Sequence, residues 1–198
     1  DYTVTTFNSS LSRSSAPNLS TGRYDLAATN NNNYALFGGG YASSGYSTVV
    51  DAYNSSLTRT TAPALSRNRG NLGAASVGGY ALFCGGDTGY AGRYANVDAY
   101  DGSLTRTIAP ELSIAKTHMG STSIGGYALF GGGATMEGYY YYIRSNVVDV
   151  YDTSLTRTSG HLLKTARYNL AATSIGKYAL FGGGCIDEWS ESSTVDVY

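Results

Sequence analysis

The sequence predicts an all-β protein and, within that class, a β-propeller of four-stranded antiparallel blades. Two short markers repeat along the whole chain, both with spacings of 46, 47 and 51 residues. The markers are the leucine of SLTRT or its variant SLSRS, at Leu11, Leu57, Leu104 and Leu155, and the tyrosine of YALF, at Tyr34, Tyr80, Tyr127 and Tyr178. A repeat of this length that holds four strands is typical of a propeller blade.

Each repeat contains four strand-like runs, which we name a, b, c and d. Examples are NLAATSIG at 169–176 for strand a, YALFGGG at 178–184 for b, VVDVY at 147–151 for c and SLTRT at 154–158 for d. No segment shows sustained apolar periodicity of 3.6 residues, so we expect almost no helix. We expect one domain, 1–198, with repeat units at about 1–48, 49–95, 96–145 and 146–198.

The connections and side chains of these runs suit antiparallel sheets. In three units Gly-Gly or Gly-Lys joins strands a and b, which is hairpin chemistry. Strands c and d are joined through an Asn or Asp, whose side chain can bond its own backbone and set the turn. The small residues of strand a suit the crowded axis of a propeller. The Leu-Phe pairs of strand b suit the space between neighbouring sheets, at 36–37, 82–83, 129–130 and 180–181.

These units resemble kelch repeats, which also form the blades of galactose-oxidase-type propellers. The resemblance rests on YALFGGG followed by VDVYD, and on a basic residue ahead of strand a, at Arg23, Arg69, Lys116 and Arg167. Kelch units likewise carry apolar residues before a double glycine, and a tyrosine in the third strand. They usually place a tryptophan in the fourth strand, where this chain has the leucine of SLTRT. The resemblance implies a divergent kelch-like propeller with four repeats in the chain.

The strand count leaves two ways to close the ring. Strands a, b and d each occur four times, but strand c occurs five times, at Val4, Val50, Val97, Val148 and Val195. Residues 11–14 could supply the missing d strand beside 195–198, which leaves one c strand without a place. We expect either a closed four-bladed ring with one c strand unpaired, or two chains that share blades in an eight-bladed ring, because open strand edges favour such pairing.

The composition excludes several classes of partner. Charged residues make up 14% of the chain and the net charge is −1, with no run of Lys or Arg, so we expect no nucleic-acid partner. No apolar run approaches the length of a membrane span, so we expect no membrane insertion. Cys84 and Cys185 are too few for a disulfide framework in a chain of this length. Cys84 occupies a glycine position of strand b, which indicates a small buried residue.

The two faces of the predicted propeller differ in sequence. In an up-and-down blade, the b–c and d–a connections leave one face, and the a–b and c–d connections leave the other. The second face is nearly the same in all units. On the first face, the b–c loops GYASSGYS, DTGYAGRYA, ATMEGYYYYIRS and CIDEWSESS differ in length and content. Diversified loops on a uniform frame usually carry recognition.

These loops are rich in Tyr, Gly and Ser, a composition that antibody paratopes use, and flat aromatic rings also suit the C–H faces of sugars. We therefore predict a binding site for a glycan or a protein surface on this face. The alternative interpretation is that the tyrosines pack on one another or continue strand c. The predicted ligand-binding residues are Tyr41, Tyr46, Tyr90, Arg93, Tyr94, Tyr139, Tyr140, Tyr141, Tyr142, Arg144 and Trp189.

We predict no catalytic residue, no metal and no cofactor. The two histidines, His118 and His161, have no metal-ligand spacing, and the acidic residues 187, 188 and 191 of the fourth loop are typical of a solvated loop. The aspartate of VDxY recurs in every unit but the first, where Thr5 replaces it. We expect this aspartate to be architectural, bonded to backbone or to the repeated arginines Arg59, Arg106 and Arg157.

The function predicted from the sequence is a non-catalytic recognition or adhesion module, whose partner is a glycan, a protein surface or a second copy of the chain. The repeats resemble those of bacterial and phage surface and tail proteins, which by analogy alone favours an extracellular, cell-surface or virion location. The main alternative is a structural, self-assembling propeller scaffold, natural or engineered, without a ligand. An enzyme with its site on the loop face comes third.

Overall fold

The computed structural model describes residues 3–89, 92–137 and 141–198. These residues form strands, turns and loops, so the all-β prediction is confirmed. Within those ranges there is no α-helix, and no helical segment is long and apolar enough to cross a membrane.

Three four-stranded antiparallel sheets follow one another along the chain, each with its strands in the order a, b, c, d. The first sheet contains β3 (Ala27–Asn30), β4 (Tyr34–Gly38), β7 (Val50–Asn54) and β8 (Arg59–Ala62). The second contains β9 (Gly73–Val77), β10 (Tyr80–Cys84), β11 (Val97–Tyr100) and β12 (Arg106–Ala109). The third contains β13 (Gly120–Ile124), β14 (Tyr127–Gly131), β17 (Val148–Tyr151) and β18 (Arg157–Ser159).

The remaining strands form one smaller sheet and three hairpins. The fourth sheet has only strands a to c, which are β19 (Ala171–Ile175), β20 (Tyr178–Gly182) and β21 (Val195–Val197). An N-terminal hairpin pairs β1 (Val4–Phe7) with β2 (Arg13–Ala16). The b–c loops of the first and third sheets contain the hairpins β5 (Tyr41–Ala42) with β6 (Gly45–Tyr46) and β15 (Ala134–Glu137) with β16 (Tyr141–Arg144).

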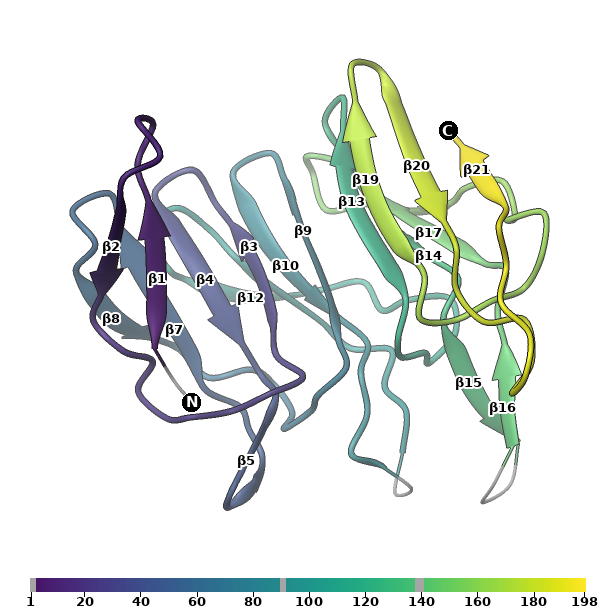
Figure 1. The fold of residues 1–198 in the computed structure, drawn as a ribbon, viewed down its shortest axis with the longest axis horizontal. Helices are drawn as coiled ribbons and strands as arrows, with labels where there is room; N and C mark the ends of the chain where they lie inside the picture. Colours follow the sequence, from purple (N-terminus) through teal and green to yellow (C-terminus); the bar gives the residue numbers. More distant parts are fainter. Residues whose placement is uncertain (1–2, 90–91, 138–140) are drawn as a thin grey trace.

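The inner strands of the four sheets pack side by side in the order β3, β9, β13, β19 (Figure 1). The N-terminal hairpin lies at one end of this series, and the fourth sheet lies at the other end. The five predicted c strands are present, but β2, the strand that could complete the fourth sheet, pairs with β1 instead. Antiparallel sheets arranged around a row of inner strands fit a β-propeller.

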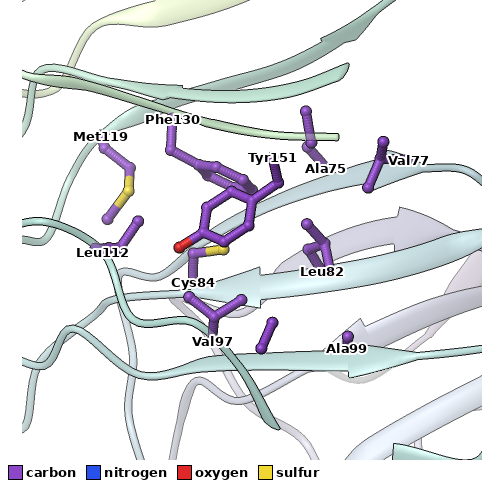
Figure 2. Packing of buried hydrophobic residues seen from close by; sticks show 12 residues of the cluster. Ala75, Val77, Leu82, Cys84, Val97, Ala99, Leu112, Met119, Phe130 and Tyr151 are labelled. Atoms are coloured by element: carbon purple, nitrogen blue, oxygen red, sulfur yellow. The ribbon is translucent and has the colours of Figure 1, made fainter. Parts of the chain in front are cut away.

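Three apolar clusters fill the spaces between neighbouring sheets. Between the second and third sheets, Phe130 and Tyr151 point toward Leu82 and Cys84 (Figure 2). The equivalent clusters are centred on Phe83 between the first and second sheets and on Phe181 between the third and fourth. The phenylalanines of strand b at these three positions therefore lie between sheets, as the sequence predicts.

The glycine at the end of strand b allows this close packing. A Cβ atom at Gly38 would lie 2.7 Å from the Phe83 ring, and one at Gly131 would lie 2.6 Å from the Phe181 ring. Cys84 occupies the equivalent position of the second sheet and is fully buried, as the sequence predicts. Both cysteines are free thiols, and burial raises the pKa of Cys84 well above its ordinary value.

A buried aspartate on strand c joins each complete sheet to the connection that enters it. In the second sheet, Asp98 accepts hydrogen bonds from the Ser66 backbone N–H at 3.1 Å, from Arg69 at 2.7 Å and from Arg106 at 3.1 Å. Ser66 and Arg69 belong to the d–a connection, whereas Arg106 lies on strand d of the same sheet. The same set surrounds Asp51, with Ser20, Arg23 and Arg59 as its partners.

The third sheet uses a lysine in this arrangement. Lys116 is fully buried, lies 3.0 Å from Asp149 and donates to the Phe130 and Val147 carbonyls. Burial alone would raise the pKa of Asp149, but the charge of Lys116 and the hydrogen bonds from Ser113 outweigh it and hold this pKa below its ordinary value. The pKa of Asp51 is lowered against burial in the same way, by Arg59, Ser20 and Arg23. The predicted architectural role of these aspartates is therefore confirmed.

The leucine of SLTRT differs from the prediction. The sequence places it in strand d, at the position of the kelch tryptophan, but Leu57, Leu104 and Leu155 lie in the c–d turn with φ values of 59°, 64° and 62°. Strand d begins two residues later, at the arginine. In this turn the Asn54 side chain accepts hydrogen bonds from the Ser56 and Thr58 N–H groups, which holds the leucine in the left-handed region.

We predict that Asp98→Ala lowers the free energy of unfolding by about 3–5 kcal/mol, because it leaves Arg69 charged and without a carboxylate in the core. Denaturant unfolding measures the change. The matched control is Asp196→Ala, the same position in the fourth sheet, where the side chain is 15% exposed and contacts one arginine instead of two. The control should lose less stability, and equal losses for the two variants would contradict this account.

Candidate functional site

The b–c loops and d–a connections emerge on one face, which we call the loop face. Each b–c loop forms a backbone bridge with the residue just ahead of strand a of its own sheet: Tyr24 with Tyr41, Gly70 with Asp87, Thr117 with Ala134 and Tyr168 with Cys185. On the opposite face, Asn31 of an a–b turn donates to the Asp101 carbonyl of the next sheet's c–d turn. The predicted division of the connections between two faces is therefore confirmed.

Three tyrosines cluster at the first b–c loop. The Tyr41 ring lies 5.4 Å from Tyr24 and 4.9 Å from Tyr46, centroid to centroid, with the second pair edge to face. Such geometries are favourable for aromatic pairs. The short β5–β6 hairpin places Tyr41 directly across from Tyr46, and the bridge to Tyr24 adds the third ring.

Tyr46 connects this cluster to the second sheet. A Cβ atom at Gly70 would lie 3.2 Å from the Tyr46 ring, so the absence of a side chain there makes room for the tyrosine. Burial raises the pKa of Tyr46, and the negative charge of Asp87 raises it further. The Tyr46 hydroxyl is therefore a neutral group that can donate or accept a hydrogen bond.

A shallow pocket of 270 Å³ opens beside the tyrosine cluster. Its lining residues are Gly22, Arg23, Tyr24, Tyr41, Ala42 and Ser43. Tyr24 is 61% exposed, so a large part of its ring is open to a ligand. Arg23, the charged member of this lining, is buried and bonded to Asp51 at 2.9 Å. The accessible chemistry of the pocket is therefore aromatic and neutral polar.

A second group of polar residues lies where the inner strands begin. Asp25, Asn71, His118 and Asn169 each stand two residues before an inner strand, with φ between 51° and 55°. Their backbones form a chain, because Asn71 N–H donates to the Asp25 carbonyl, His118 to Asn71 and Asn169 to His118, at 2.9–3.1 Å. The left-handed conformation favours Asn and Asp, which explains three of the four residue types.

His118 is the exception in this group. Its Nδ1 atom is buried and has no hydrogen-bond partner among the described residues. Burial lowers the pKa of His118, Asp87 and Asp25 act in the opposite direction, and Arg93 adds to the lowering. Asp87 is itself buried, and its Oδ2 lies 2.7 Å from the Thr117 hydroxyl. Within the described ranges no group of three or more His, Cys, Asp or Glu residues could hold a metal ion.

The structure brings together only part of the predicted binding set. Tyr41 and Tyr46 share the tyrosine cluster, while Tyr94 in the second loop lies under the Arg67 guanidinium at 5.2 Å, with its hydroxyl 3.1 Å from Thr88. Arg93 donates to the Gly89 carbonyl within that loop. Tyr94 and Arg93 thus make contacts within and beside the second loop, and neither lies in the tyrosine cluster of the first loop.

Arg144 and Trp189 lie on other loops. Arg144 ends β16 and has its Nε buried without a hydrogen-bond partner among the described residues. Trp189 is 88% exposed, in a fourth-loop turn where its backbone N–H donates to the Asp187 carboxylate. Tyr90, Tyr139 and Tyr140 lie outside the described residues. For Tyr141 and Tyr142 the structure gives the backbone, in register with Glu137 and Met136.

Sequence reasoning missed Tyr24, and it did not group His118 with Asp25, Asn71 and Asn169, which precede the other inner strands. Tyr24 belongs to a d–a connection, and only the fold shows that this residue pairs with the b–c loop of the same unit. The sequence nevertheless contains a pattern that marks these positions. In each unit the repeated basic residue is followed by a variable position and then by Asp, Asn or His: Tyr-Asp, Gly-Asn, Thr-His and Tyr-Asn.

Comparison with known proteins supports the fold. No family model matches the sequence, and no curated protein matches it either. Among solved structures, one described as "Structure of YjhT" superimposes with a TM-score of 0.77 at 12% sequence identity. The match covers 98% of this chain and 72% of that chain. At this identity the likeness shows the fold alone, and it agrees with the β-propeller fitted above.

We predict that His118→Asn removes part of the acid sensitivity of folding. Since burial lowers the pKa of His118 in the folded protein, the unfolded chain takes up a proton first, at about pH 6.5. The contribution of the neutral His118 side chain to the free energy of unfolding is therefore fully present above about pH 6.5. It is lost as the pH falls from there toward the lowered pKa of the folded state. Asparagine, found at the same left-handed position in two other units, keeps the backbone conformation.

Urea unfolding between pH 7.5 and 5 tests this prediction. The wild-type protein should lose more stability over that range than His118→Asn does. His161→Asn, at an exposed histidine, serves as the control for removing an imidazole. If His118→Asn shows the same pH slope as the wild type, His118 does not contribute to the acid sensitivity.

Proposed function

We propose that this chain is a divergent kelch-like propeller module that binds a neutral glycan on its loop face and catalyses no reaction. The observation that supports the proposal most strongly is the tyrosine cluster of Tyr24, Tyr41 and Tyr46 beside an open pocket. Aromatic rings stack on the C–H faces of sugars, and the pocket edge adds the Ser43 hydroxyl and backbone groups for hydrogen bonds.

The charge of the pocket favours a neutral sugar. Arg23 is already bonded to Asp51 and to the Phe37 carbonyl, so it is not free to bind an acidic group. Next to Tyr41, the Tyr46 hydroxyl stays neutral because burial raises its pKa. A stacked sugar ring with hydroxyl hydrogen bonds therefore matches the pocket better than an anionic ligand does.

The contrast between the two faces argues against a purely structural role. The turns of the opposite face use the same Asn or Asp side-chain bonds in each unit, at Asn54, Asp101 and Asp152. The loop face instead carries Tyr, Asp, Ala and Cys at one equivalent position, namely 41, 87, 134 and 185. Variation confined to one face of a repeated frame is typical of ligand recognition.

The binding prediction is tested by Tyr24→Ala and Tyr41→Ala on an array of immobilised neutral glycans. Wild-type protein should bind at least one sugar class, and each substitution should weaken that binding by about tenfold or more, because loss of a central aromatic contact costs about 2 kcal/mol. Tyr127→Ala, at an exposed tyrosine beside the a–b turn of the opposite face, should bind as the wild type does.

Two results would contradict the proposal. One is wild-type protein that binds none of the arrayed glycans, which would favour the scaffold alternative. The other is an equal loss of binding in Tyr127→Ala, which would place the site elsewhere. The residues 139–142 stay predicted contacts of the third loop, and serine replacement of all four on the same array tests them separately.

A further inference from the structure

The four residues that precede the inner strands continue the tyrosine cluster across the loop face, and we call them the polar row: Asp25, Asn71, His118 and Asn169. The row begins beside Tyr46. Gly70 directly precedes Asn71, and a Cβ atom at Gly70 would lie 3.2 Å from the Tyr46 ring and 3.6 Å from the Asp25 Cβ atom. From Asp25 the row runs through backbone hydrogen bonds, first to Asn71 at 2.9 Å and then to His118 at 3.1 Å.

The polar row adds contact surface outside the pocket of the first loop. Backbones joined by such hydrogen bonds lie about 5 Å apart, so the two steps from Asp25 to His118 span about 10 Å. Neither Asn71 nor His118 lines the pocket beside Tyr24 and Tyr41. A ligand that fills the pocket and also reaches His118 must therefore be longer than one that fills the pocket alone.

The two central side chains of the row have polar atoms left for a ligand. Asn71 donates its side-chain N–H to the Asp87 carboxylate at 3.4 Å, which leaves the amide oxygen of Asn71 for another donor. The imidazole of His118 forms no hydrogen bond among the described residues, and since its Nδ1 is buried, Nε2 is the atom that can meet a ligand. An amide oxygen and an imidazole nitrogen both bond hydroxyl groups well.

The backbone of the row would accept glycine, yet each position carries a side chain. Glycine adopts a positive φ without strain, as Gly78 does at 55° in an a–b turn. At the other repeated position with positive φ, Leu104 packs against an apolar cluster. The described contacts of the Asn71 and His118 side chains are one hydrogen bond of 3.4 Å and one edge-to-face ring contact with Tyr168. These weaker contacts leave a ligand as the physical reason for both side chains.

A second aromatic pair borders the polar row. The His118 ring lies 6.4 Å from the Tyr168 ring, centroid to centroid, with the two planes at 86°. Along the backbone chain, the Asn71 amide therefore stands between the Tyr46 ring at one end and the His118–Tyr168 pair at the other. This alternation suits a chain of sugars, whose rings pack on aromatic side chains while their hydroxyls form hydrogen bonds.

We propose that the ligand of the loop face is a neutral oligosaccharide of at least two units, with one ring on the tyrosine cluster and the next over Asn71 and His118. This inference rests on the glycan binding proposed above and adds the length of the ligand. Burial raises the pKa of Tyr46, and the charges of Asp87 and Asp25 raise it further. The same two carboxylates would repel an acidic sugar, so the ligand is neutral along its length.

Isothermal titration calorimetry tests the proposal with oligomers of glucose, mannose, galactose and N-acetylglucosamine, each of one to four units. For a sugar that binds, the trimer should bind about tenfold more tightly than the monomer or better, because the second ring adds contacts with the polar row. Asn71→Gly and His118→Gly should each reduce this gain by about fivefold, as expected for loss of one hydrogen bond. Since glycine keeps the positive φ, thermal unfolding should show that both variants remain folded.

Asn32→Gly is the matched control, because Asn32 is an exposed asparagine with a φ of 73° in an a–b turn of the opposite face. This variant should keep the full gain from monomer to trimer. If the wild-type protein binds a monomer as tightly as a trimer, or if Asn71→Gly and His118→Gly keep the full gain, the inference is wrong while the proposed glycan binding stands. If the wild-type protein binds none of the oligomers, the inference and the proposed function both fail.

Discussion

The fold depends on a carboxylate that is buried in each complete sheet. Asp51, Asp98 and Asp149 each bind the backbone of the entering d–a connection, a basic residue ahead of strand a and an arginine on strand d. One side chain thus joins the outer half of a sheet to the segment that leads into its inner strand. Because a buried ion pair must keep all of its partners to be favourable, this cluster specifies how the chain returns from the outer edge of one sheet to the inner strand of the next.

This constraint separates the structural residues from the variable ones. The aspartate, the basic residue, the tyrosine of strand c and the double glycine recur because each has a fixed contact in the frame, such as Tyr100 with the Pro63 carbonyl. Beyond the double glycine the units share a backbone bridge to the residue ahead of strand a, but the side chains at that position differ from unit to unit. They are therefore free to differ, and the first loop uses that freedom to gather Tyr24, Tyr41 and Tyr46 around a pocket.

Much of the frame could be predicted from the sequence, since every unit repeats the same residues for the same contact. The strand order, the Leu-Phe pairs buried in the second and third sheets and the architectural aspartates follow from that repetition. The turn leucines could not be predicted, because a strand-like pattern does not reveal that Leu57 adopts a positive φ. Tyr24 was missed for a different reason, since its pairing with Tyr41 joins two connections that lie far apart in the repeat pattern.

The pairing of β2 is another feature that could not be predicted from the sequence. Counting strands identifies five c strands, but it does not decide which partner β2 takes. In the fold β2 pairs with β1, from Val4 opposite Ala16 to Phe7 opposite Arg13. The sequence therefore predicts the repeated unit better than it predicts the pairing of the N-terminal hairpin.

Native-state hydrogen exchange tests the central role of the buried aspartates most directly. The Ser66 and Ser113 amides lie in connections outside any strand, yet each donates to a buried aspartate. They should exchange as slowly as the core amides of β10 and β14, through global unfolding alone, while the amides of β5 and β6 exchange faster. Exchange of Ser66 and Ser113 at the rate of the loop hairpins would contradict the account, because the aspartates would then not hold the connections in place.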